Sequence, residues 1–249
     1  MTNTLRLLKL WSKNYVSHDA EIFIEKTKMT VTIKALSTMP YFNGLNAEEL
    51  AAVKNCISHE KRIDKGEMLL LEGDQSEYMY LIISGAVKIF KRSVNGKEQI
   101  LNIASTGETL NDVATFDGGA CAMDMLAMTP VRLCAVKKED MRSLFARFPR
   151  IALNVAGVLA AKVRRDSSLV EVLSFDHIIS RLAKLILKQS DAGGAMLPLF
   201  TQQDLAAMVG TSRVVVNRSL KAMEDKGAIR MTRRRIVITD AEALKQLVR

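Results

Sequence analysis

The sequence predicts an α+β fold in three parts: a β-rich domain, one long helix and a C-terminal winged helix-turn-helix. Three observations predict this fold. Short apolar runs from His59 to Val136 are separated by glycine and aspartate, which is typical of strands joined by turns. Apolar residues then recur at helical spacing from Glu139 to Leu173. Beyond Thr201, two short helical segments flank Gly210, and two short apolar runs follow them.

Residues 1–35 are assigned to an N-terminal extension. Met29 would be a natural start for the first domain, so the residues before it are either an additional helix or the product of a start codon placed too far upstream. They lack the long apolar segment and small-residue cleavage site of a signal peptide. A short helix is then expected from Asn46 to Ile57, because Asn46 and Glu49 form a capping-box pattern at its start.

The β-rich domain is expected over residues 36–138. Asn95 and Gly96 lie between two runs of alternating apolar residues, and this dipeptide predicts a tight β-hairpin. Several strands at such spacing indicate a small barrel, roll or sandwich.

A long helix is expected over residues 139–175. Seven of its residues alternate at spacings of four and three and form a heptad-like seam, namely Ala152, Ala156, Leu159, Val163, Asp166, Val170 and Leu173. The seam has to be buried, either on the β-rich domain or on a second copy of the chain. We favour a dimer helix because the flanking positions are strongly charged. Asp166 is the polar exception, and such a residue often fixes the register of the helices or serves a ligand.

The winged helix-turn-helix is expected over residues 176–249. Thr201 caps a short helix, Gly210 makes the turn, and Thr211 opens the second helix. Gly227 ends that helix as a C′ glycine. Two short strands, 229–231 and 235–238, form the wing.

Composition favours an anionic partner in a reducing compartment. The net charge is +9, and ten basic against five acidic side chains lie between Leu199 and Arg249, which favours nucleic acid. The apolar runs are too short for a membrane span, so no membrane association is expected. Three cysteines without a CxxC spacing indicate neither a disulfide framework nor a four-thiolate cluster, and a cytoplasmic location is expected.

The second helix of such a unit enters the DNA major groove with its N-terminal residues facing the bases. Arg213 and Arg218 suit guanine, because an arginine fork bonds O6 and N7 together, and Arg218 could instead pair with Asp225. Val215, Leu220 and Met223 are expected in the core. The candidate DNA contacts are Thr211, Ser212, Arg213, Val214, Asn217 and Arg218 on the helix, with Arg233 and Arg234 on the wing.

The chain from Ile33 to Ile238 resembles the CRP/FNR family of bacterial transcription regulators. Three segments carry the resemblance: DKGEMLLLEGDQSEYMYLIISGAVKIF, GKEQILNIASTGETL and FTQQDLAAMVGTSRVVVNRSLKAMEDKGAI. The resemblance implies a cupin-like β-roll that senses an effector, a dimerisation helix and a DNA-binding winged helix. It also implies a homodimer, double-stranded DNA with a two-fold symmetric operator as partner, and contact with RNA polymerase if the protein is an activator.

The recognition helix departs from the family pattern. Many members carry Arg-Glu-x-x-x-Arg, and here Val214 occupies the glutamate position between Arg213 and Arg218. A glutamate can accept from cytosine N4, whereas valine can only touch a thymine methyl group. We therefore expect a half-site that differs from the family consensus at that base pair.

The sensor domain also departs from the members that bind cyclic AMP. Those members use a Gly-Glu pair for the ribose and an Arg-Ser pair for the cyclic phosphate. Asn111-Asp112 stands in the first place, and Ala120-Cys121 or Cys121-Ala122 in the second. A buried phosphate needs a charged donor, so cyclic AMP is not expected. The long helix offers Arg165-Asp166 where those members have Thr-Ser. The candidate pocket residues are Leu110, Asn111, Asp112, Cys121, Ala122, Arg165 and Asp166.

Other effectors known in the family stay open to different degrees. An iron–sulfur cluster needs clustered cysteines and is not expected. Haem needs an axial ligand beside an apolar pocket, and the candidate ligands are His18, His59, Cys121 and His177. A lone histidine is more often structural, and His177 could simply cap a helix. A thiol switch at Cys121, a small organic ligand near Asn111, Asp112 and Arg165, and a regulator without a ligand are the remaining alternatives.

Two other functions are alternatives to DNA binding. A β-roll of this kind can act on a protein partner as a cyclic-nucleotide-binding-like regulatory module, but the winged helix argues against that function here. An enzyme is not expected, because the sequence contains no HExxH, P-loop, nucleotide-binding GxGxxG or nucleophile elbow.

Overall fold

The computed structural model describes residues 31–191, 200–232 and 236–248. The described residues from Val31 onward belong to one compact unit. His18, Arg233 and Arg234 lie outside the described residues, as does most of the expected N-terminal extension. The predicted α+β fold is confirmed, with a β-roll, a long helix and a winged helix-turn-helix in that order.

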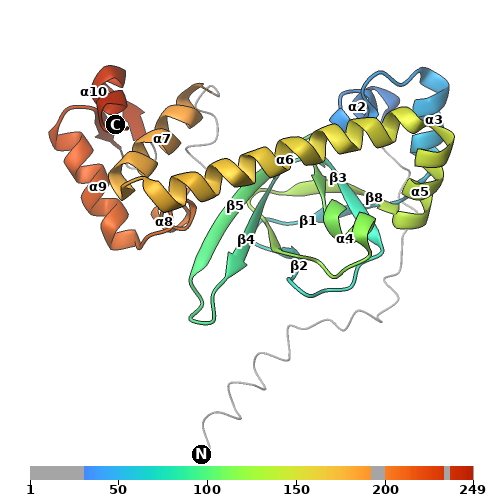
Figure 1. Ribbon diagram of the computed structural model, residues 1–249, viewed down its shortest axis with the longest axis horizontal. Coiled ribbons are helices and arrows are strands. Elements are labelled where there is room, and N and C mark those ends of the chain that lie inside the picture. Colours follow the sequence, from blue (N-terminus) through green and yellow to red (C-terminus); the bar gives the residue numbers. More distant parts are fainter. Residues whose placement is uncertain (1–30, 192–199, 233–235, 249) are drawn as a thin grey trace, which may run out of the picture. The chain divides into compact units, whose positions relative to one another are not determined.

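The β-roll consists of two four-stranded antiparallel sheets (Figure 1). The first has the order β1 (Ile57–Ile63), β8 (Val131–Lys137), β3 (Tyr78–Ser84) and β6 (Thr109–Leu110). The second has the order β2 (Met68–Leu70), β7 (Asp124–Ala127), β4 (Ala86–Arg92) and β5 (Glu98–Ser105). Side chains from both sheets share one core, including Ile82, Leu133, Val87, Ala104 and Met125. A short helix, α4 (Asp112–Asp117), connects β6 to β7.

The predicted hairpin at Asn95-Gly96 is confirmed as the turn between β4 and β5. Gly96 has φ +74°, and its N–H donates to Ser93 O at 2.8 Å. The Ser93 N–H donates to Lys97 O at 2.9 Å. The two strands project from the roll in Figure 1.

A second core joins the N-terminal helices to the roll. α2 (Ile33–Ser37), the 3-10 helix η2 (Pro40–Phe42) and α3 (Ala47–Asn55) contribute Leu36, Tyr41, Phe42, Leu50 and Val53, all at most 4% exposed. The predicted capping box at the start of α3 is present, with Glu49 N to Asn46 Oδ1 at 2.9 Å and Asn46 N to Glu49 Oε2 at 2.8 Å. α3 ends two residues earlier than expected, because β1 begins at Ile57.

The expected continuous helix over 139–175 is wrong at one point. The chain forms α5 (Lys138–Arg147) and α6 (Pro149–Phe175), with a bend of 117° between them. Phe148 leaves the helical region at φ −131° and ψ 80°. The cause is Pro149, which lacks an N–H and disfavours helical dihedrals in the residue before it.

The C-terminal domain has the predicted helix-turn-helix and wing. It comprises α7 (Ile178–Asp191), α8 (Gln202–Val209), α9 (Arg213–Asp225), β9 (Ile229–Met231) and β10 (Ile236–Ile238). β9 and β10 pair antiparallel, and their core is shared with α10 (Ala241–Gln246), which the sequence analysis did not anticipate. Gly210 and Gly227 adopt φ +74° and +71°, as the turn and the helix end require.

Within the part of the chain that the structure describes, no helix taken singly has the length and apolar character of a membrane span. Among the described helices, one bent pair, α5 and α6, meets those criteria when the two helices are counted together.

Candidate nucleic-acid interface and effector site

Helix α9 is anchored on one side and exposed on the other. Its N-cap Ser212 accepts from Val215 N at 3.4 Å. Val216, Leu220 and Met223 are at most 1% exposed and pack in the core of the domain. Val215 is only half-buried, so the expectation that it lies in the core is wrong, and Val216 takes that place. The valine run is a single hydrophobic stretch, and helix register alone decides which member faces inward.

The outward face of α9 carries most of the predicted DNA contacts. Arg213, Val214 and Arg218 are exposed, and Val214 reaches 68% exposure. Arg213 Nε donates to Gln202 Oε1 on α8 at 3.3 Å, so Gln202 positions the arginine at the start of the helix. Asn217 is half-buried, and its Oδ1 is buried without a hydrogen-bond partner. Asp225 accepts from Lys221 Nζ at 3.1 Å, and no ion pair to Arg218 is found there.

Glu224, which sequence analysis missed, ties the recognition helix to the wing. Its Oε1 accepts from Met231 N at 2.8 Å. This bond, with a smaller contribution from Lys221, lowers the pKa of Glu224 below its usual value, because both favour the carboxylate. The signal was a glutamate in the last turn of the helix, which by itself does not identify a hydrogen-bond partner on a later strand.

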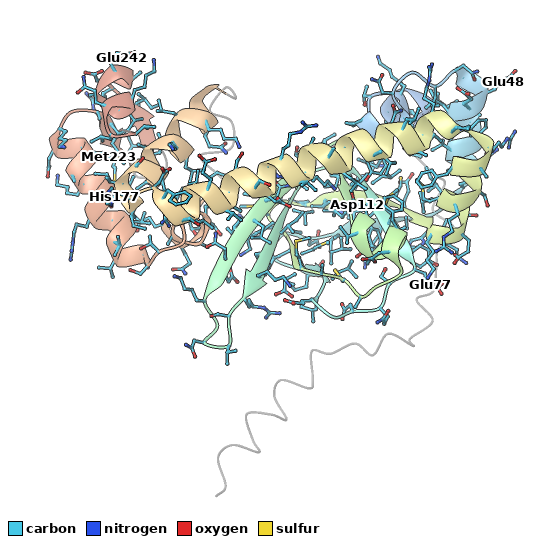
Figure 2. All side chains as sticks on the ribbon, in the orientation of Figure 1. Glu48, Glu77, Asp112, His177, Met223 and Glu242 are labelled. Atoms are coloured by element: carbon cyan, nitrogen blue, oxygen red, sulfur yellow. The ribbon has the colours of Figure 1, made fainter. Side chains whose placement is uncertain are left out.

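The candidate effector site centres on Asp112, whose side chain is 7% exposed. Its Oδ2 accepts from Tyr41 Oη at 2.6 Å and from Thr109 Oγ1 at 3.0 Å. The ammonium group of Lys162 on α6 forms an ion pair with the same oxygen. One buried carboxylate therefore joins η2, β6 and the long helix. Figure 2 labels Asp112 next to the long helix. The sequence analysis named Asp112 but missed these three partners.

Asn111 stands where the resemblance would place a glycine, and its backbone conformation is one that glycine favours. It adopts the left-handed conformation, with φ +62°, which only glycine and, less readily, asparagine or aspartate tolerate. Its Nδ2 donates to Tyr78 O at 2.9 Å, and its Oδ1 is buried without a partner. Asn111 is thus the residue that turns the chain from β6 into α4 and so places Asp112.

The other predicted pocket residues do not all gather at Asp112. Leu110 and Cys121 are at most 2% exposed and belong to the core of the roll. Ala122 is half-buried beside them. Arg165 and Asp166 lie next to each other on α6, with Arg165 Nε 3.7 Å from Asp166 Oδ1. Lys162, one turn earlier on α6, is the residue that reaches Asp112. Because Lys162 is three residues before Arg165, it lies on the same side of the helix, and this spacing could have identified it from the sequence.

The candidate haem ligands that the structure describes come from separate elements. His59 on β1 makes an edge contact with Tyr78, at 5.2 Å between ring centroids, and burial lowers its pKa. Burial raises the pKa of the Cys121 thiol, and the thiol donates to Met123 O at 3.2 Å. His177 lies between α6 and α7, where its carbonyl accepts from Arg181 N at 2.9 Å (Figure 2). Within the described residues, no cluster of three or more histidine, cysteine, aspartate or glutamate side chains is arranged to hold a metal ion.

The β4–β5 hairpin contacts α8 directly. Phe90 and Ile100 of the hairpin share a small core with Ala207 of α8. Lys88, 7% exposed, bridges Glu98 Oε2 at 2.7 Å and Asp204 Oδ1 at 3.9 Å. The roll therefore meets the first helix of the helix-turn-helix through apolar and charged contacts together.

Arg181, on α7, joins the ends of two other helices. Its guanidinium donates to Leu173 O at 2.7 Å and Asp176 O at 2.9 Å, both at the end of α6. It also donates to Val209 O at 3.0 Å, at the end of α8. These carbonyls have no partner within their helices, and an arginine supplies the donors that they need.

The comparisons with known proteins cover both domains. Residues 60–148 match the family described as "Cyclic nucleotide-binding domain", and residues 180–247 match "Crp-like helix-turn-helix domain". The chain is 30% identical over 210 residues to the cyclic AMP receptor protein of Thermus thermophilus, covering 84% of this chain and 96% of that protein. It is 29% identical over 215 residues to a CRP-like cAMP-activated global transcriptional regulator of Mycobacterium tuberculosis, covering 84% and 96%.

Solved structures of similar fold belong to the same kind of protein. The catabolite activator protein of Thermus thermophilus is 28% identical, with a TM-score of 0.50, over 84% of this chain and 98% of that one. The c-di-GMP responsive regulator CLP of Xanthomonas campestris, at 21% identity, shares the fold with a TM-score of 0.71 over 78% of this chain and 99% of that one. The chain therefore belongs to the CRP/FNR family of transcription regulators.

Proposed function

We propose that the protein is a homodimeric regulator that binds a specific, roughly two-fold symmetric DNA operator and responds to an effector other than cyclic AMP. The observation that carries DNA binding is the outward face of α9. Arg213, Val214 and Arg218 are exposed there, while Val216 and Leu220 hold the opposite face in the core. A helix that is anchored on one side and carries arginines on the other suits the major groove.

The contacts on this face divide by chemistry. Arg213 and Arg218 bond guanine O6 and N7, and Asn217 and Val214 lie between them at base edges. Thr211, Ser212 and the free amides at the start of α9 take a phosphate. Arg233 and Arg234 on the wing hold the DNA backbone.

Exposed apolar side chains on α6 support the dimer. Four large ones are more than 60% exposed: Leu153 at 74%, Val163 at 65%, Val170 at 64% and Phe175 at 82%. Val163 and Val170 belong to the predicted heptad-like seam and are one heptad apart, so a partner helix would cover both, whereas Leu153 and Phe175 lie outside that seam. A two-fold dimer along α6 presents two copies of α9 to half-sites about one DNA turn apart.

The site at Asp112 supports an effector other than cyclic AMP. The segment from Asp117 to Met123, where related proteins place the arginine for the cyclic phosphate, contains neither lysine nor arginine. Lys162, the cation that does reach the site, is already paired with Asp112. A phosphate buried here would compete with the Asp112 carboxylate for Lys162. The effector classes we propose are a small organic ligand near Asn111, Asp112 and Arg165, or haem held by one of the candidate ligands elsewhere, with contact to RNA polymerase if the protein activates transcription.

Fluorescence anisotropy with an operator selected from random DNA tests the DNA-binding part. Arg213→Ala and Arg218→Ala should each weaken binding about ten- to hundredfold, the loss expected for one bidentate guanine contact. Lys221→Ala is the matched control, because Lys221 is exposed on the same helix and is paired with Glu224 and Asp225. Unchanged affinity in both arginine variants would contradict the proposal.

Two measurements test the effector. Calorimetric titration with cyclic AMP should show no heat of binding at millimolar nucleotide. An absorption spectrum of protein supplied with haem, reduced and exposed to carbon monoxide, should show a Soret band that shifts with the gas if haem is the effector. A featureless spectrum leaves a small organic ligand, and saturable cyclic AMP binding overturns the assignment.

A further inference from the structure

The three consecutive valines of α9 have different surroundings. Val216 is fully buried, Val215 is half-buried, and Val214 is 68% exposed. An exposed valine gains nothing from the core, and its β-branched side chain is less favourable in a helix than alanine. Folding therefore gives no reason for a valine at position 214.

Val214 lies among the polar side chains of the proposed DNA interface. It is the second residue of α9, directly after Arg213, whose Nε is held by Gln202 Oε1 at 3.3 Å. Arg218 follows four residues later, so it lies one helical turn along the same face. Val214 is thus an apolar group between two arginines at the N-terminal end of the helix, the end that approaches base edges.

The major groove presents one apolar group, the C5-methyl of thymine, and otherwise hydrogen-bond donors and acceptors. We propose that Val214 is a specificity-determining residue that packs against a thymine methyl group, at a base pair next to a guanine read by Arg213. This inference rests on the proposed function and names the base chemistry of the same interface. It also means that 5-methylcytosine, which carries a methyl group at the same place, replaces this thymine better than cytosine does.

The test removes single methyl groups from the DNA. Each thymine of the selected operator is replaced in turn by deoxyuridine, which keeps every hydrogen-bonding group. Wild-type protein should lose about fourfold in affinity at one thymine per half-site, the effect of withdrawing one buried methyl group. Val214→Ala keeps only the Cβ methyl group, so it should discriminate between the thymine and deoxyuridine operators less than wild type does. Val237→Ala, which alters an exposed valine of the wing, should keep the wild-type profile.

A second arm replaces the sensitive thymine pair by a cytosine pair, with and without a C5-methyl group. Methylation should restore part of the affinity for wild-type protein and a smaller part for Val214→Ala. Sequence-specific binding with no deoxyuridine-sensitive position, or with the same sensitivity in Val214→Ala, overturns the inference and leaves the proposed function standing. Absence of sequence-specific DNA binding overturns both.

Discussion

The ammonium group of Lys88 on β4 lies 3.9 Å from Asp204 Oδ1 on α8, while Glu98 Oε2 on β5 takes the same ammonium at 2.7 Å. A lysine of the β-roll is therefore neutralised partly by a residue of the helix-turn-helix. Asp204 has a second role, because its carboxylate completes the capping box with Thr201 at the start of α8. One acid both starts a DNA-binding helix and faces the hairpin.

Removing Lys88 should destabilise the chain measurably. Lys88→Ala leaves two partly buried carboxylates without their cation and removes the ammonium that lies 4.4 Å from the Phe90 ring. Breaking such a pair from one side costs about 2–4 kcal/mol, seen as a lower urea midpoint. Lys91→Ala is the control, because its pair with Glu72 is about half exposed and contributes less than about 1 kcal/mol. Equal midpoints for the two variants would contradict the buried bridge.

The Asp112 site should behave as a coupled unit. Tyr41→Phe removes one donor from a buried carboxylate and should cost about 1–3 kcal/mol in urea unfolding. In an Asp112→Asn background the same substitution should cost less, because the charged acceptor is gone. A double-mutant cycle measures the difference. Additive effects would show that the tyrosine stabilises the fold without help from Asp112.

Gly210 should be harder to replace than Gly227, although both have positive φ. Alanine at either position adopts a strained conformation that costs about 1 kcal/mol. At Gly210 a Cβ would also lie 3.1 Å from Leu173 Cδ2 and 3.2 Å from Gln99 Oε1, whereas nothing lies within 4 Å at Gly227. Gly210→Ala should therefore lower the melting temperature further than Gly227→Ala. Similar melting temperatures for the two variants would mean that Leu173 and Gln99 move aside without loss of stability.

Stability should fall as the pH is lowered from about 7 to 5, partly through His59. Burial and the charge of Lys61 lower the pKa of His59 below its ordinary value of about 6.5. The unfolded chain then binds a proton that the folded chain resists. The contribution of neutral His59 is therefore fully present above the ordinary pKa and is lost as the pH falls from that pKa through the lower pKa of the folded state. Thermal melting at pH 7.5 and 5.5 should show a smaller decline for His59→Phe than for wild type. An identical decline would assign the pH dependence to other groups.

The parts of the fold that sequence predicted are those with local causes. Asn95-Gly96, Thr201, Gly210 and Gly227 each determine a turn or a helix end within a few residues, and the structure agrees at each. The bend at Phe148 had a local signal as well, in Pro149, which the helical periodicity masked. Val215 was assigned to the core because adjacent apolar residues do not specify helix register to within one position.

The candidate site was only partly predictable, because its contacts are distant in sequence. Asp112 and Lys162 are fifty residues apart, and Tyr41 lies further away on the other side. Their meeting depends on how α6 and η2 pack on the roll, which no single segment encodes. Asp112 could be identified from the family resemblance. That Lys162 and not Arg165 contacts it depends on the packing of α6, which the sequence does not show.

The guanidinium of Arg181 has a mechanical consequence. Because it donates to carbonyls at the ends of both α6 and α8, the two helices cannot turn against each other while these bonds persist. A change in their angle has to break or rearrange these bonds and leaves three carbonyls to find new donors. In the proposed dimer, movement of the two copies of α9 relative to the long helices would therefore require Arg181 to change its hydrogen-bond partners.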